Sequence, residues 1–146
     1  MMTEDDRNKI LIVDDELQNL QSFKATFRRT YNVFTALSAE EGFNILLDEP
    51  DICVVVSDHK MPVKTGVEFL EDLKNLYPEM IRIVLTGYAD LESTRDAINK
   101  ASVYRFLNKP RNEADLAGTL ASAVELFHTR SQLKKNREEL ENAYAE

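Results

Sequence analysis

The chain has 146 residues, of which 43% are hydrophobic, and a formal net charge of −8. Its length allows one domain with a substantial core, and its acidity argues against direct nucleic-acid binding, which needs clustered Lys and Arg. The single cysteine, Cys53, excludes a disulfide framework and fits a reducing, cytoplasmic setting. The polar N-terminus and the lack of a long apolar run predict neither a secretory signal nor a membrane span.

Residues 1–8 are expected to be a polar lead-in to a domain that spans residues 9–128. A first buried strand is predicted at residues 9–13, because a short apolar run ends there on the acidic pair Asp14 and Asp15. Apolar residues then recur at steps of three and four, which is typical of a helix lying on a sheet. These residues are Leu17, Leu20, Phe23, Phe27 and Tyr31.

A second strand is predicted at residues 32–36, followed by a helix with Ser38 as its N-cap. Glu41 stands three residues after Ser38, which is the spacing of a capping box. Pro50 is expected to end this helix. Its apolar residues are Phe43, Leu46 and Leu47.

The apolar run at residues 52–58 stops on a carboxylate, Asp58. A continuous run of mostly β-branched residues of this length predicts a central strand of a parallel sheet, buried on both faces. Thr65 is expected to cap the next helix, and Pro78 to end it. The core face of that helix is predicted to comprise Val67, Leu70, Leu73, Leu76 and Tyr77.

Two further strands are predicted at residues 81–85 and 103–107, the second at an edge of the sheet because its apolar residues alternate. They end close to Thr86 and Lys109, respectively. Between them, a short helix from Asp90 has a thin apolar face and is expected to be weakly anchored.

Five alternations of strand and helix predict an α/β fold with a doubly wound, five-stranded parallel sheet between two layers of helices. This flavodoxin-like arrangement has the strand order 2-1-3-4-5, and ligands bind at the carboxyl edge where that order reverses. Asp14, Asp15 and Asp58 are expected to meet at this point. Thr86 and Lys109 are expected on the same edge.

Two or three carboxylates in one crevice repel each other by roughly 4 kcal/mol per pair at about 4 Å and an effective dielectric near 20. Mg²⁺ suits such a site, because it takes one or two protein carboxylates together with water and a phosphate oxygen. Lys109 and the Thr86 hydroxyl could contact a phosphoryl group. Asp58 is the best-placed nucleophile, because a carboxylate can attack phosphorus to form an acyl phosphate.

These residues resemble the receiver domain of response regulators in two-component signalling. The resemblance spans roughly residues 8–128 and rests on the following segments: Val13-Asp14-Asp15-Glu16, Ser57-Asp58-His59-Lys60-Met61-Pro62, Gly66, Thr86-Gly87 and Lys109-Pro110. It implies that Asp14 and Asp15 hold Mg²⁺ together with Asp58 and the backbone carbonyl of Lys60. It also implies that a sensor histidine kinase or a histidine phosphotransfer protein phosphorylates Asp58.

The resemblance further implies that Thr86 and Lys109 contact the phosphoryl group and that Phe106 is the switch aromatic residue. Phe106 has no phenolic hydroxyl, so a signal read through that group is absent. The chain would then be a switch with slow self-dephosphorylation rather than an enzyme. Lys60 and Tyr88 are expected to crowd the path of the attacking water and to slow this loss of phosphate.

His59 and His128 have no second metal-ligand neighbour at helical spacing and are expected to be bystanders. A long final helix is predicted from about Asn112, with residues 129–146 as an extension. Leu126, Leu133 and Leu140 recur at heptad spacing, and Asn136 would lie in the other core position. A solvated tail, a dimeric coiled coil and a linker to a partner all remain open.

The expected function is a phosphorylation-driven switch that changes its contact with a downstream protein or a fused output domain. The alternative is a phosphatase that passes through an aspartyl phosphate, but such enzymes need a second acid two residues after the nucleophile, where this chain has Lys60. A flavin-binding module is a third candidate. Asp14 and Asp15 would repel the flavin phosphate.

Overall fold

The computed structural model describes residues 6–87, 95–96, 98–108 and 113–144. Five strands form one parallel sheet in the order β2-β1-β3-β4-β5, which confirms the predicted topology. The strands are β1 (Lys9–Val13), β2 (Asn32–Ala36), β3 (Val54–Asp58), β4 (Ile81–Thr86) and β5 (Arg105–Asn108). The central strand β3 is therefore flanked by β1 and β4, and β5 lies at an edge as predicted.

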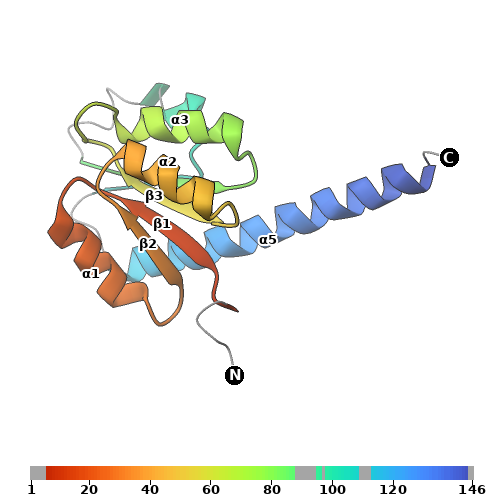
Figure 1. The fold of residues 1–146 in the computed structure, drawn as a ribbon, viewed down its shortest axis with the longest axis horizontal. Coiled ribbons are helices and arrows are strands. Elements are labelled where there is room, and N and C mark those ends of the chain that lie inside the picture. Colours follow the sequence, from red (N-terminus) through yellow and green to blue (C-terminus); the bar gives the residue numbers. More distant parts are fainter. Residues whose placement is uncertain (1–5, 88–94, 97, 109–112, 145–146) are drawn as a thin grey trace.

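Helices cover both faces of the sheet (Figure 1). They are α1 (Leu17–Phe27), α2 (Ala39–Asp48), α3 (Gly66–Leu76) and α5 (Glu113–Tyr144). Helices α1 and α5 pack on one face, whereas α2, α3 and residues near Ala101 pack on the other. The predicted short helix from Asp90 lies largely outside the described residues, although residues 95–96 and 98–100 are helical.

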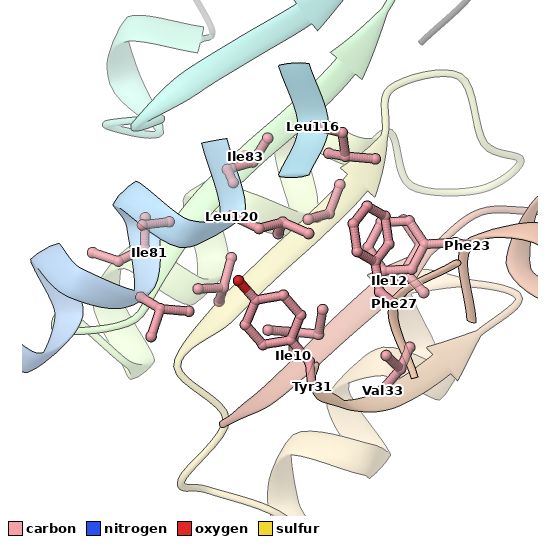
Figure 2. Close-up of a cluster of buried hydrophobic side chains, with 14 of the residues drawn as sticks. Ile10, Ile12, Phe23, Phe27, Tyr31, Val33, Ile81, Ile83, Leu116 and Leu120 are labelled. Carbon is pink, nitrogen blue, oxygen red and sulfur yellow. The ribbon is translucent and has the colours of Figure 1, made fainter. Parts of the chain in front are cut away.

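The core consists of two clusters, one on each face of the sheet. Along β1, Ile10 and Ile12 belong to the first cluster, whereas Leu11 and Val13 belong to the second. This alternation follows from the two-residue period of a strand. Figure 2 shows the first cluster, in which side chains from α1 and α5 meet those of the sheet. Burial on both faces explains why the central strands read as continuous apolar runs.

Two leucines assigned to helix core faces by their spacing, Leu17 and Leu76, are exposed instead, and so is Leu47, an apolar residue of the second predicted helix. Leu17 is 56% exposed, Leu47 72% and Leu76 62%. Leu17 is the first residue of α1, and Leu76 is the last residue of α3. Leu47 follows the fully buried Leu46, and one step rotates a side chain by about 100° around a helix. For Leu17 and Leu76 the helical spacing was right and the extent of the buried face was wrong, whereas Leu47 lies on the exposed face of its helix.

Some element boundaries also differ from the prediction. Residues 52–53 are buried but precede β3, and β5 begins two residues later than expected.

Thr65 caps α3 with a complete capping box, in which Thr65 and Glu68 bind each other's backbone N–H. At α2, the Ser38 hydroxyl accepts from the Glu41 N–H, but the Glu41 carboxylate accepts from Leu37 instead of Ser38.

The buried side chain of Arg82 supports the sheet away from its carboxyl edge. The Arg82 guanidinium donates to the carbonyls of Met80, Ala101 and Ser102, and burial lowers the pKa of this group. These bonds hold the segment that leads into β5. Cys53 is a small core residue as predicted, and burial raises the pKa of its thiol to about 11.

The last helix, α5, is continuous over 32 residues and extends well beyond the sheet (Figure 1). Its first part packs on the core through Leu116 and Leu120. Further along, Lys134 forms an ion pair with Glu79 at 2.8 Å, and Leu133 and Leu140 are 61% and 58% exposed. None of the helices in the described part of the chain combines the length and apolarity needed to cross a bilayer.

Candidate functional site

Three carboxylates meet where β1 and β3 end. Val13 pairs with Ser57 across these strands, which brings the residues that follow each strand to the same edge. Carboxylate oxygens of Asp14, Asp15 and Asp58 lie within 4.8 Å of one another. Asp14 and Asp58 are buried, whereas Asp15 is exposed. The structure therefore brings together the three acids that the sequence places at this edge.

Hydrogen bonds fix the orientation of Asp14. Its Oδ1 accepts from the Glu16 N–H at 2.9 Å, and its Oδ2 accepts from the Asn19 side-chain amide at 3.1 Å. Asn19 was not predicted as a site residue. Its position three residues into α1 places it over the end of β1, but a polar residue on an otherwise solvated helix face gives no distinctive sequence signal.

The main chain at Asp58 is held by close packing from α3. A Cβ atom on Gly66 would fall 2.0 Å from the Asp58 carbonyl oxygen, so no larger residue fits without a backbone shift. The Gly66 N–H donates to the His59 carbonyl at 2.8 Å, and the Ser57 hydroxyl donates to the Asp58 carbonyl at 2.9 Å. The loop after β3 is therefore closed tightly behind the carboxylate.

Thr86 ends β4 on the same edge of the sheet. Leu85 pairs with Asp58 across β3 and β4, so Thr86 follows the residue next to the carboxylate. The side chain is buried, and its hydroxyl donates to the Gly87 carbonyl at 3.4 Å. A bond of this length is weak, which leaves the hydroxyl able to turn toward another acceptor.

The structure describes only two of the four remaining predicted site residues. Lys109 and Tyr88 lie outside the described residues. Lys60 is exposed two residues after β3, and Phe106 on β5 is 43% exposed. Within the described part of the chain, the buried Nδ1 of His59 has no hydrogen-bond partner.

The donor set fits a small, hard cation. At about 4.8 Å and an effective dielectric near 20, two carboxylates repel by ~3 kcal/mol, and the burial of Asp14 and Asp58 limits screening by water. An oxygen-ligated divalent ion would offset this repulsion, and Mg²⁺ binds through one or two carboxylates while keeping several waters. The acidic cluster could therefore bind a metal.

Comparisons with known proteins agree with this geometry. The family model of the response regulator receiver domain matches residues 10–121. The hydrogenase transcriptional regulatory protein HoxA of Cupriavidus necator is 36% identical over 121 residues, which are 83% of this chain and 25% of HoxA. The chain spans about a quarter of the length of the first curated relatives it matches.

Two solved structures show the same fold at moderate identity. The signal receiver domain of an HD domain-containing protein from Pseudomonas fluorescens Pf-5 has a TM-score of 0.80 and 30% identity, covering 90% of this chain and 96% of that one. A response regulator receiver domain protein from Clostridium thermocellum has a TM-score of 0.75 and 32% identity, covering 86% and 98%. With its sheet order, its three clustered carboxylates and the match over residues 10–121, this chain belongs to the response regulator receiver domain family.

Proposed function

We propose that this chain is a phosphorylation-driven switch in which Asp58 accepts a phosphoryl group from a histidine kinase or a histidine phosphotransfer protein. Receiver domains of response regulators are switches that act with histidine kinases and output domains. The observation that carries the assignment to Asp58 is its buried position in the carboxylate cluster with Asp14 and Asp15.

In the proposed transfer, an Asp58 carboxylate oxygen forms a bond to phosphorus as the phosphorus–nitrogen bond of the donor phosphohistidine breaks. The imidazole leaves with the electron pair of that bond and takes up a proton. Asp14, held by the Glu16 N–H and Asn19, would bind Mg²⁺ together with Asp15, Asp58 and the Lys60 carbonyl. When bound, this ion supplies positive charge that stabilises the transferring phosphoryl oxygens.

Other side chains have supporting roles in the proposal. The Thr86 hydroxyl donates to a phosphoryl oxygen, which its weak 3.4 Å bond to Gly87 permits. Lys109 contacts the same group, and the half-exposed Phe106 repacks to change the surface near β5. Lys60 and Tyr88 slow phosphate loss by crowding the attacking water. No observation favours the phosphatase alternative, and Lys60 stands where its second acid would be.

The arrangement of the whole protein is also a proposal. We propose that residues 9–128 form the receiver domain and that residues 129–146 form its helical extension. Leu133 and Leu140 are exposed at heptad spacing, which supports a homodimer or a link to an output domain through this helix. We also propose that the protein acts in the cytoplasm and does not contact nucleic acid directly.

Intact mass spectrometry after incubation with acetyl phosphate tests the function. We expect wild-type protein to gain one phosphoryl group when Mg²⁺ is present and none when EDTA removes it. Steady hydrolysis of a phosphomonoester such as p-nitrophenyl phosphate would support the phosphatase instead. Absence of any adduct with Mg²⁺ present would contradict the proposed switch.

A further inference from the structure

A mainly apolar pocket of about 320 Å³ lies beside the carboxylate cluster. Its apolar lining includes Leu37, Phe43, Pro62 and Val63, which come from the segment before α2, from α2 itself and from the loop after β3. Asp15 belongs to both the pocket and the carboxylate cluster. The pocket is therefore continuous with the surface that a phosphoryl donor has to reach.

Val63 is presented to solvent in an unfavourable backbone conformation. Its φ angle is 71°, and the Lys64 N–H donates to the Pro62 carbonyl at 2.8 Å, which is the arrangement of a γ-turn. A β-branched residue rarely adopts such a conformation, and strain of this kind concentrates at functional sites. The side chain is fully exposed, so burial in this chain does not offset the strain.

Neighbouring contacts hold this wall of the pocket in place. Lys64 forms an ion pair with Asp72 on α3, and its Nζ lies 5.7 Å from the centre of the Phe43 ring. The loop end is closed by the Gly66 N–H bond to the His59 carbonyl. Val63 is therefore exposed and strained, but its loop is held in place. Together with Leu37, which is 42% exposed, it forms a preformed apolar contact surface.

The rim of the pocket indicates what kind of group fits. Asp15 and Glu40 are both exposed at the rim, whereas the charge of Lys64 is paired with Asp72. A volume of 320 Å³ lies at the lower limit of small-molecule pockets, which span roughly 300 to 1,000 Å³, and suits one or two side chains. Apolar anchor residues seated in such pockets often dominate protein interfaces.

We propose that this pocket binds an apolar side chain of the phosphodonor protein, flanked there by a Lys or Arg residue that faces Glu40. The proposal rests on the proposed phosphorylation of Asp58. According to this proposal, Leu37 and Val63 help the chain to bind the donor protein, and they take no part in the phosphoryl transfer itself. A small donor that needs no docking surface should therefore be insensitive to them.

Val63→Asn and Leu37→Ser test this inference. Asparagine tolerates a positive φ, so Val63→Asn removes the apolar group without adding strain. Leu47→Ser is the matched control, because Leu47 is 72% exposed on α2 and does not line the pocket. Purified sensor histidine kinases are autophosphorylated with radiolabelled ATP, and the one that phosphorylates wild type fastest serves as the protein donor. Acetyl phosphate with Mg²⁺ is the small donor.

We expect each pocket variant to lower kcat/KM for the kinase about tenfold, with unchanged rates for acetyl phosphate and no effect of Leu47→Ser. Equal kinase rates in variants and wild type would overturn the inference. So would a matching loss with acetyl phosphate, because the substitutions would then act on the site itself. Transfer from acetyl phosphate but from none of the kinases would also contradict it, whereas failure of wild type with acetyl phosphate would instead refute the proposed function.

Discussion

Replacing Asp58 with Asn is expected to abolish phosphorylation by acetyl phosphate while raising the stability of the metal-free protein. The amide lacks the carboxylate oxygen that attacks phosphorus. The substitution also removes one of three charges whose oxygens lie within 4.8 Å of one another. Two such charges repel by ~3 kcal/mol at an effective dielectric near 20, and water around the exposed Asp15 weakens the repulsion that involves this residue. We therefore expect the free energy of unfolding to rise by about 1 kcal/mol.

When Mg²⁺ is bound, wild-type protein is expected to be more stable than Asp58→Asn, the reverse of the order without metal. A ligand present at 100 times its dissociation constant stabilises the folded state by about 2.7 kcal/mol, and Asp58→Asn removes one of the ligands. Urea denaturation of both proteins with EDTA and with saturating Mg²⁺ measures the two effects. Asp48→Asn, at an exposed position on α2 outside the cluster, should change neither. Equal stabilisation of wild type and Asp58→Asn by Mg²⁺ would contradict the assigned metal site.

Replacing Gly66 with Ala is expected to lower the free energy of unfolding by roughly 3 kcal/mol and to slow phosphorylation. The new Cβ would lie 2.0 Å from the Asp58 carbonyl oxygen, a distance that forces the backbone of β3 or α3 to move. Such a shift would also displace the loop behind the carboxylate. Urea denaturation, with the acetyl phosphate reaction as a second measurement, tests both parts.

Gly118→Ala is the matched control for this prediction. A Cβ at Gly118 would meet no atom within 4 Å, and the residue lies inside α5. Alanine is favoured over glycine in a helix interior, so this variant should be more stable by about 0.5 to 1 kcal/mol. If both variants gain stability, the close approach of α3 to Asp58 is not a constraint on the fold.

Most of the fold was predictable because its elements are separated by clear local signals. The apolar runs at β1, β3 and β4 are buried on both faces, and the N-caps Ser38 and Thr65 mark the starts of α2 and α3. The extent of the buried helix faces was harder to predict, because Leu17 and Leu76 have the right period for the buried face but are exposed. Only tertiary packing decides where the buried face stops.

The acidic cluster was predictable for a different reason. Parallel strands end at one edge, so the carboxylates that follow β1 and β3 had to be neighbours once the strand order was known. The support given by Asn19 and the pocket beside Val63 could not be inferred in this way. The first depends on the direction of the Asn19 side chain and the second on the positive φ angle of Val63, and the residue types specify neither.

Chemical mapping of the phosphoryl group tests the central claim most directly. Wild-type protein treated with acetyl phosphate and Mg²⁺ is reduced with sodium borohydride, which converts an aspartyl phosphate to homoserine, and peptide mass spectrometry locates the product. We predict conversion at Asp58 alone, with Asp14 and Asp15 unmodified. Conversion at another residue, or none at Asp58 in a protein that has gained a phosphoryl group, would contradict the account.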